Sequence, residues 1–401
     1  MDNPLTALSL AQLRERRSIK WRQYDPDVLP LWVAEMDTPL AEPVAEVLAA
    51  AVARGDTGYA HPGRLREAFA GFAARRYGWT PDPARMVVLP DLMQAIDEVL
   101  AVVTAPGDGV VINPPVYPPF FGVITMGGRR VVPSPLARSD DGRYALDLDA
   151  LDRDLARPDV RAYLLCNPHN PTGTVLRPDE LTAIAEIAAR HDVVVLVDEI
   201  HAPLIYRAPW PGRGAAPDVA EPATAAKPHT PFATVSGSAI AFVSASKAWN
   251  LPGLKAALAV ATGAEAWDRL AAVPIEPTYG TGLFGVLAGE AAFTAGEPWL
   301  DALVDGLDQN RRLLADLLDE YLPGTGYVPP EATFLAWLDM TGHGLGDNPA
   351  DEFLRHGVAL TPGPAFGPEG NGHARLNFAT SPELLTAALQ RMAPALPRDR
   401  G

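Results

Sequence analysis

Short runs of β-branched and other apolar residues recur along the first two thirds of the chain and alternate with segments of helical periodicity. Because these runs are apolar at consecutive positions, they are typical of strands that are covered on both faces, as in a parallel sheet. The predicted strands lie at residues 86–89, 109–112, 130–132, 162–165, 193–197 and 240–243. This alternation of strands and helices predicts an α/β layered domain over residues 45–285.

The clearest of the intervening helices covers residues 178–191. Pro178 suits the first helical position, where no backbone N–H is needed for an intrahelical hydrogen bond. Leu181, Ile184 and Ile187 recur at helical spacing and give the segment one apolar face. Helices of this kind would cover the faces of the predicted sheet.

The pattern changes after the last of these strands. The spacing of the leucines predicts one long amphipathic helix over residues 299–321, although Gly306 should weaken it by about 1 kcal/mol relative to alanine. The elements expected after this helix are two strands and two shorter helices, at residues 333–338, 375–378, 351–356 and from Pro382 onward. We therefore predict a smaller α+β domain over residues 286–396, joined by the N-terminal segment 1–44.

Residues 208–232 are rich in proline, alanine and glycine and have weak periodicity. They fall between two predicted strands. Because segments of this composition usually run over the surface, we expect a solvent-exposed excursion rather than a lid over a functional site.

Composition changes this picture mainly by exclusion. Hydrophobic residues make up 48% of the 401 residues, which excludes a disordered chain. The formal net charge of -16 supplies no basic field, so we expect neither a nucleic-acid partner nor binding to a membrane. The single cysteine, Cys166, excludes an internal disulfide, and the first 21 residues contain no apolar signal-peptide core, so a cytoplasmic location is expected.

Three polar side chains stand at or shortly after predicted strand ends. Asn170 lies in Asn-Pro-His-Asn-Pro-Thr-Gly, Asp198 follows the apolar run 193–197, and Lys247 lies in Ser-Ala-Ser-Lys. Ligands of open α/β sheets bind at the carboxyl ends of the strands, so we expect these side chains to lie together. An acid that keeps a ring nitrogen protonated and a lysine that holds an aldehyde suit pyridoxal phosphate.

Each of these residues would have a chemical task at this cofactor. Asp198 paired with a pyridinium would stay ionised despite burial, and Asn170 would donate to the 3-oxygen of the ring. His201 would lie one helical turn after Asp198 and face the same oxygen. Lys247 must be neutral to attack the aldehyde, so its site should lower its pKa.

A binding site for the cofactor phosphate is predicted from residues that offer hydroxyl groups, a cation and the backbone N–H groups of a helix that begins at residue 91. These residues are Ser244, Ser246, Lys255, Asp91, Leu92 and Met93. The carboxylate of Asp91 is an awkward neighbour for a phosphate, so we assign this contact to its backbone.

Each of these residues also has a structural alternative. Asp198 could cap the following helix, Asn170 could belong to an ordinary turn, and Lys247 could be a surface lysine. A single histidine such as His201 is more often structural. We favour the cofactor because the motifs occur together, and because Trp249 and other apolar neighbours of Lys247 favour its burial.

The motifs also carry a resemblance to a known family. They are Leu-Trp-Val-Ala-Glu-Met-Asp at 31–37, Asp-Glu-Ile-His at 198–201, Ser-Lys-Ala-Trp-Asn at 246–250 and Ala-Arg-Leu-Asn at 374–377. Over nearly its whole length the chain resembles fold-type I pyridoxal phosphate enzymes of the class I/II aminotransferase superfamily, and within it the branch of cystathionine β-lyases and C–S lyases (PatB-like and maltose-regulon repressor-like proteins). The resemblance implies a large cofactor-binding domain with a mixed, mostly parallel sheet between helices, and a smaller α+β domain.

The resemblance implies roles for further residues. Tyr117 would stack on the pyridine ring, and Tyr59 would reach the phosphate of the neighbouring subunit, so the active sites would be shared in a homodimer. Arg375 would grip the α-carboxylate of an amino-acid substrate as a fork.

The substrate pocket would be shaped by the N-terminal motif, and Val33 and Ala34 would line it together with Asn170. Two residues depart from the pattern of the branch. Glu35 stands where the branch usually has aspartate, and Asp91 stands where many members have a small residue. No metal is expected at this site.

Several reactions share the first step, in which Lys247 removes the Cα proton of the substrate. We favour β-elimination, which cleaves cystathionine or a cysteine S-conjugate to a thiol, pyruvate and ammonia. Transamination between an amino acid and a 2-oxo acid is the main alternative. Decarboxylation at Cα is a further alternative, because it uses the same site. A regulatory role is another, because one relative in this branch also represses transcription.

Overall fold

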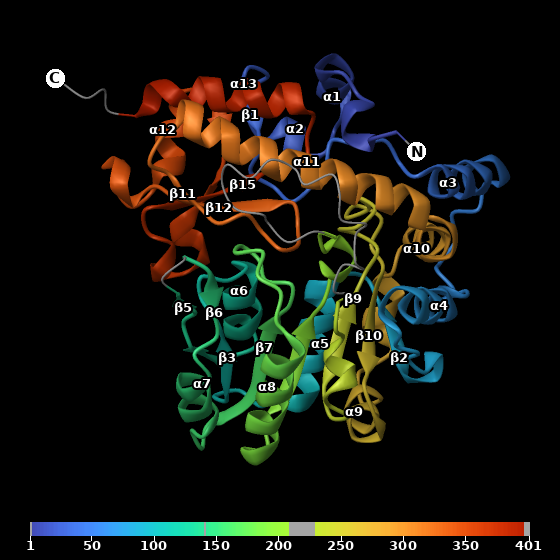
Figure 1. Cartoon of the computed structure of the whole chain (residues 1–401). Coiled ribbons are helices and arrows are strands. Elements are labelled where there is room, and N and C mark those ends of the chain that lie inside the picture. Colours follow the sequence, from blue (N-terminus) through green and yellow to red (C-terminus); the bar gives the residue numbers. More distant parts are fainter. Residues whose placement is uncertain (1, 140–141, 208–228, 397–401) are drawn as a thin grey trace.

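The computed structural model describes residues 2–139, 142–207 and 229–396, and its largest feature is a seven-stranded sheet (Figure 1). The strands lie in the order β2-β10-β9-β8-β7-β3-β4. The strands from β9 to β4 are parallel, whereas β10 runs antiparallel to both of its neighbours. Their bounds are β2 Met86–Leu89, β3 Gly109–Ile112, β4 Arg130–Pro133, β7 Val160–Cys166, β8 Val194–Asp198, β9 Ile240–Val243 and β10 Ala257–Ala261. The predicted mixed, mostly parallel sheet is confirmed.

Helices cover both faces of this sheet, because successive residues of a strand point to opposite sides. On β8, Val194 and Leu196 pack with α5, α6 and α9, whereas Val195 and Val197 pack with α7 and α8. The bounds of these helices are α5 Leu92–Val103, α6 Pro119–Met126, α7 Leu148–Leu155, α8 Pro178–Arg190 and α9 Ala264–Leu270. This two-sided burial explains the uninterrupted apolar runs in the sequence.

A smaller sheet lies beside the large one, with its strands in the order β11-β12-β15-β14. The N-terminal segment lies against this part of the chain, because β1 pairs in parallel with β13 (Figure 1). The bounds are β1 Leu29–Pro30, β11 Gly326–Tyr327, β12 Leu335–Asp339, β13 Val358–Ala359, β14 Thr361–Pro362, β15 His373–Asn377, α11 Glu297–Tyr321, α12 Pro349–Arg355 and α13 Pro382–Met392. The division into residues 1–44, 45–285 and 286–396 remains a prediction.

The remaining α-helices and strands are α1 Leu10–Glu15, α2 Ile19–Arg22, α3 Glu42–Arg54, α4 Leu65–Tyr77, α10 Leu283–Ala295, β5 Ala137–Arg138 and β6 Tyr144–Ala145. Helices α4 and α10 pack on residues of β2, β9 and β10. Across the three described ranges, no helix is both long and apolar enough to pass through a membrane.

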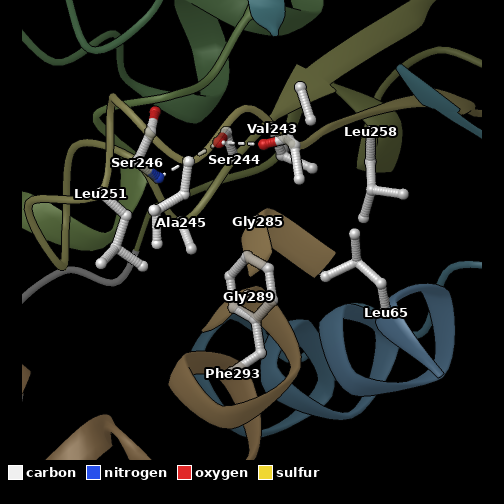
Figure 2. Close-up of a pocket in the computed structure, with 13 residues that line it drawn as sticks. Leu65, Val243, Ser244, Ala245, Ser246, Leu251, Leu258, Gly285, Gly289 and Phe293 are labelled. Carbon is white, nitrogen blue, oxygen red and sulfur yellow. Dashed lines mark hydrogen bonds between the residues drawn. The ribbon is translucent and has the colours of Figure 1, made fainter. Parts of the chain in front are cut away.

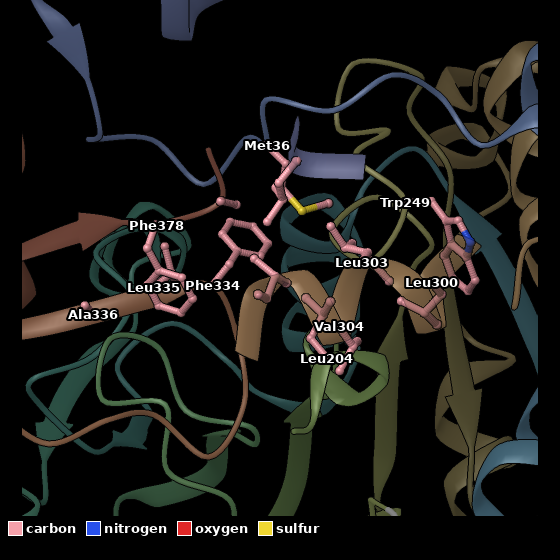
Figure 3. Close-up of a cluster of buried hydrophobic side chains, with 14 of the residues drawn as sticks. Met36, Leu204, Trp249, Leu300, Leu303, Val304, Phe334, Leu335, Ala336 and Phe378 are labelled. Atoms are coloured by element: carbon pink, nitrogen blue, oxygen red, sulfur yellow. The ribbon is translucent and has the colours of Figure 1, made fainter. Parts of the chain in front are cut away.

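One hydrophobic cluster joins the two sheets (Figure 3). It contains Trp249 from the loop after β9, Leu303 from α11 and Phe334 from the segment before β12, all of them buried. Met36 extends the cluster to the N-terminal segment. Burial of one such side chain contributes about 1.5–3 kcal/mol, so the cluster holds the two sheets and the N-terminal segment in one arrangement.

Gly306 is required by packing rather than by backbone conformation. A Cβ atom at this position would lie 2.2 Å from Oδ1 of Asn3, so a larger residue in α11 would displace the N-terminal turn. Glycine therefore destabilises helix α11 slightly, but it allows the N-terminal turn to pack closely against this helix.

Three expectations differ from the structure. Strand β10 was not predicted, because alternate positions in it are alanine, a weak strand former. His201 does not lie one α-helical turn after Asp198 but precedes a short 3-10 turn. Residues 208–228 of the expected surface excursion lie outside the described residues. The prediction of solvent exposure is wrong for the last residues of this segment. His229 and Phe232 are buried, and both contact the carboxylate of Glu199.

Candidate active site

The residues predicted to form the site line one cavity of about 270 Å³ at the carboxyl edge of the large sheet. Apart from Tyr59, all of them contribute to its wall: Val33, Ala34, Asp91, Leu92, Met93, Tyr117, Asn170, Asp198, His201, Ser244, Ser246, Lys247, Lys255 and Arg375. Ile200, Pro252 and Ala256 complete the wall. These three were missed because their side chains are apolar and nothing in the sequence distinguishes them from core residues.

Lys247 lies in the loop that follows β9, and its Nζ donates a hydrogen bond of 2.9 Å to the carbonyl oxygen of Ala34. Burial and the nearby guanidinium of Arg375 lower the pKa of Lys247 to about 8, from an ordinary value of 10.5. A considerable neutral fraction is therefore present at mildly alkaline pH. This is the property that a lysine needs in order to attack an aldehyde or to accept a proton.

Asp198 is the last residue of β8 and is buried. Its Oδ1 accepts a hydrogen bond of 3.0 Å from the backbone N–H of Ile200. Burial raises the pKa of Asp198 to about 7, although this hydrogen bond and the charge of Lys247 oppose the shift. A cation in the cavity beside Asp198 would restore the ionised carboxylate.

Arg375 reaches the cavity from β15 of the smaller sheet. Its Nη1 donates to Oδ1 of Asn170 at 3.0 Å, and its Nη2 donates at 3.1 Å to Trp32 O and Thr361 Oγ1. Burial lowers the pKa of Arg375 to about 10, so the guanidinium remains charged at neutral pH. The contact also orients Asn170, since its amide oxygen is occupied and its NH₂ group is left to donate into the cavity.

The backbone of the N-terminal motif forms the wall opposite the sheet. Every carbonyl from Trp32 to Met36 accepts a hydrogen bond from a side chain, and the donors are Arg375, Thr361, Asn377, Lys247, Lys20, Arg16 and Asn250. Two of these donors, Lys247 and Arg375, belong to the predicted site. The motif therefore positions the site through its carbonyl groups, which the sequence analysis did not predict.

Tyr117 and His201 complete the polar lining of the cavity. Burial raises the pKa of the Tyr117 hydroxyl, and the ring of Tyr117 packs edge-on against Phe120 with centroids 5.8 Å apart. Burial and the charges of Lys247 and Arg375 lower the pKa of His201 to about 3, so its imidazole is neutral. In the described part of the chain, Nδ1 of His201 has no hydrogen-bond partner. Because His201 lines the cavity, a ligand bound there is a candidate partner for this buried nitrogen.

The loop that carries both serines is seated on α4 and α10 (Figure 2). Ser244 Oγ donates to Ala256 O at 2.7 Å and accepts from the backbone N–H of Ser246 at 3.1 Å. The hydroxyl hydrogen of Ser244 is therefore committed to the loop, and its predicted donation to a phosphate is not available in this arrangement. The void between this loop, Leu65 and Phe293 measures about 10 Å³, which is too small for a ligand.

Asp91 and Lys255 meet at the N-terminus of α5. Oδ1 of Asp91 caps this helix by accepting from Gln94 N at 2.9 Å, and Oδ2 lies 2.9 Å from Nζ of Lys255. The sequence analysis assigned Asp91 a role through its backbone only. The structure also places its carboxylate on the cation that was assigned to a phosphate.

Tyr59 is the one predicted site residue that lies outside the cavity. It stands between α3 and α4 and is 94% exposed. Its predicted reach into a neighbouring subunit remains a prediction, because one chain alone cannot form that contact.

The cavity fits pyridoxal phosphate in the chemistry of its donors and acceptors. Asp198 is a buried acid in need of a cation, which a protonated pyridine nitrogen supplies. Lys247 has the lowered pKa that suits an aldehyde partner, and His201 has an unpartnered nitrogen. Lys255 and the N-terminus of α5 offer a cation and N–H groups to a phosphate.

The comparison with known families agrees with this fit. A family model described as aminotransferase class I and II matches residues 26–392. The chain is 46% identical over 419 residues to a "Putative cystathionine beta-lyase" of Mycobacterium leprae, with 98% of each chain covered. It is 32% identical to the cystathionine beta-lyase PatB of Bacillus subtilis, over 95% of this chain and 97% of that protein.

Solved structures show the same similarity. A crystal structure described as a "putative plp-dependent beta-cystathionase" from Corynebacterium diphtheriae superimposes with a TM-score of 0.87 and 32% sequence identity. The match covers 97% of this chain and 98% of that chain. The likeness therefore extends over both sheets and the cavity between them.

Proposed function

This chain belongs to the family of class I and II aminotransferases and is a pyridoxal phosphate-dependent carbon–sulfur β-lyase, and we propose that it cleaves cystathionine or another cysteine S-conjugate to a thiol, pyruvate and ammonia. The observation that carries the proposal is the single cavity that holds Lys247, Asp198 and Arg375. The choice of elimination over transamination is supported by the relatives that are named as lyases.

The residues of the cavity divide the work of holding the cofactor. Asp198 would keep the pyridine nitrogen protonated, Asn170 and His201 would bind the 3-oxygen, and Tyr117 would pack on the ring. Nζ of Lys247 would hold the aldehyde carbon. When bound, pyridoxal phosphate accepts the electron pair that remains on the substrate Cα after this carbon has lost its proton.

Two residues act on the substrate. The guanidinium of Arg375, held by Asn170 and Trp32, would bind the α-carboxylate and orient the substrate beside Lys247. Nζ of Lys247, freed by the substrate amine, would take the proton from Cα as a general base. Elimination would follow when the C–S bond at Cβ breaks with its electrons on sulfur, the thiolate takes up a proton, and water hydrolyses the remaining three-carbon fragment to pyruvate and ammonia. Bound pyridoxal phosphate would supply a carbon to which Lys247 could deliver the proton instead, and this choice would give transamination.

The reaction products distinguish these two outcomes. We expect the purified enzyme to release pyruvate and thiol from cystathionine or an S-alkyl-cysteine without any added 2-oxo acid. The release is followed with a lactate dehydrogenase assay for pyruvate and a thiol reagent. Turnover that occurs only when a 2-oxo acid acceptor is present would contradict the lyase and support an aminotransferase.

We also propose that the enzyme is a homodimer in which Tyr59 completes the site of the neighbouring subunit. The proposal is supported by the resemblance of Thr57-Gly58-Tyr59 to the family motif, and an exposure of 94% leaves the Tyr59 side chain free to contact another molecule. Two inactive variants, Tyr59→Ala and Lys247→Ala, would then complement each other when their subunits are mixed. Half of the randomly mixed dimers would be hybrids with one intact site, so activity should recover to about a quarter of the wild-type value.

The mixing experiment is controlled by the activity of Tyr59→Ala alone and by native mass spectrometry. Native mass spectrometry of the mixture establishes that hybrid dimers have formed. If hybrids form without recovery, or if Tyr59→Ala is fully active by itself, Tyr59 does not act across a subunit boundary.

A cytoplasmic location is part of the same proposal. It is supported by the single cysteine, Cys166, which is buried and whose thiol pKa burial raises well above its ordinary value. Such a thiol is a structural core residue rather than a nucleophile. Fractionation of cells that produce the protein would test the location.

A further inference from the structure

We propose that the carboxylate of Asp91 weakens the binding of the cofactor by competing with the cofactor phosphate for Lys255. The inference rests on the proposed function, since it takes the phosphate to lie at the N-terminus of α5. It assigns Asp91 a role opposite to that of the other residues at this end of the cavity, because Asp91 opposes phosphate binding while its neighbours favour it.

The contacts of Asp91 occupy two groups that a phosphate would use. Oδ2 lies 2.9 Å from Nζ of Lys255, and Oδ1 accepts from the backbone N–H of Gln94 at 2.9 Å. Partial burial would raise the pKa of Asp91, but the hydrogen bonds from Gln94 and Lys255 outweigh burial and lower it. The group is therefore a full anion at neutral pH, and it lies in the cavity wall beside the cation that a phosphate would contact.

The backbone of Lys255 is held in place, which fixes the point from which its half-exposed side chain reaches Asp91. It has a φ of +61°, in the left-handed region that non-glycine residues rarely adopt, and its carbonyl accepts from Gly282 N at 2.8 Å. A Cβ atom at Gly285 would lie 2.3 Å from Leu254 O, so α10 packs directly on this turn. The fold thus holds Lys255 within reach of both Asp91 and the cavity.

The other cations of the described cavity wall are already engaged at different groups. Lys247 donates to Ala34 O, and Arg375 donates to Asn170 and Trp32. A phosphate at α5 would therefore depend on Lys255 and on the helix N-terminus. Asp91 forms an ion pair with Lys255 and caps the N-terminus of α5, so a bound phosphate must share or break this ion pair. The affinity for the cofactor is therefore lower than it would be without the carboxylate, and a higher cofactor concentration is needed to fill the site.

Asp91→Asn removes the charge and keeps the helix cap, because asparagine caps helices as well as aspartate does. We expect this variant to bind pyridoxal phosphate about tenfold more tightly and to release it correspondingly more slowly, as removal of one unit charge near a phosphate predicts. The dissociation constant is measured on the full-length protein by equilibrium dialysis, and the release rate by fluorescence after dilution. Neither readout requires turnover.

Two controls separate charge competition from a structural effect. Pyridoxal, which has no phosphate, should bind equally well to the wild type and to Asp91→Asn. Glu98→Gln removes the same charge farther along α5, roughly 10 Å from position 91 by the rise of a helix, and should leave the affinity for pyridoxal phosphate unchanged.

The outcomes also separate this inference from the proposed function. If the wild type does not bind pyridoxal phosphate at Lys247, the proposed function fails. If the wild type binds it but Asp91→Asn binds no more tightly, the competition is overturned while the proposed function stands. An equal gain for pyridoxal would likewise overturn it, because the effect would then not involve the phosphate.

Discussion

Replacing Lys247 by alanine should reduce kcat for elimination by about three orders of magnitude or more. General base catalysis by one residue accounts for about 10²–10⁴ in rate, and the variant also loses the amine that holds the aldehyde. The lowered pKa of Lys247, about 8, indicates that the wild-type group can serve both purposes near neutral pH. Steady-state release of pyruvate measures the loss.

The covalent attachment can be mapped directly, because the chain contains only four lysines, Lys20, Lys227, Lys247 and Lys255. Borohydride reduction of the holoenzyme followed by peptide mass mapping should place the adduct on Lys247. Lys20 and Lys255 are engaged with Asp37 and Asp91 in the structure, so both serve as internal comparisons. An adduct on any other lysine would refute the assignment of Lys247.

Chemical rescue distinguishes a lost base from a damaged fold. A small primary amine such as ethylamine should restore part of the activity of Lys247→Ala, because the truncated side chain leaves room beside Ala34 O. Failure of rescue together with a lowered melting temperature would indicate a structural role for the lysine.

Replacing Asp198 by asparagine should lower kcat/KM by about 10²–10³, the range found when one electrostatic contact to the transition state is removed. The affinity for pyridoxal phosphate should fall by less than about tenfold, since Lys247 and the phosphate contacts remain. The reason lies in burial, which raises the pKa of Asp198 to about 7 and makes the acid dependent on a cationic partner. Asparagine has nearly the same size but cannot stabilise a protonated ring nitrogen.

Glu199→Gln is the matched control for this variant. Glu199 is the next residue and is also buried, but its carboxylate contacts Phe232 N and His229 rather than the cavity. We expect Glu199→Gln to change the thermal stability more than kcat/KM. If Asp198→Asn lost cofactor affinity and turnover to the same extent, Asp198 would have a structural role and the electron-sink assignment would be wrong.

Much of the site could be predicted because its polar residues interrupt apolar segments. Asp198 ends a run of five buried strand residues, and Lys247 stands between Ser246 and Ala248, two residues before the buried Trp249. Burying such groups without a partner is costly, so their presence indicates a ligand. The lysine, the acid and the amide were recognisable for this reason.

Other parts of the site depend on contacts that sequence patterns do not encode. The carbonyls of Trp32 and Ala34 hold Arg375 and Lys247, but every residue has a carbonyl, so no residue type marks this role. The hydrogen bond from Ser244 Oγ to Ala256 O could not be predicted from the sequence for the same reason. Strand β10 was missed because alanines obscure its pattern, although it pairs with both β2 and β9.

By itself, the sequence determined the layered α/β architecture, the cofactor chemistry and the identity of most of the residues that meet at the cavity. The architecture and the roles of Lys247, Asp198 and Asn170 follow from local periodicity and from polar residues at strand ends, which are properties of neighbouring positions. Tyr117, Arg375, Val33 and Ala34 were expected from the resemblance to the C–S lyase branch. Only the tertiary structure decided how the residues are used, since it brings Asp91 onto Lys255, 164 positions away, and Arg375 onto Asn170, 205 positions away. Such pairings depend on how α5, β15 and the loops pack in three dimensions, and the distances that set charge and hydrogen bonding exist only there.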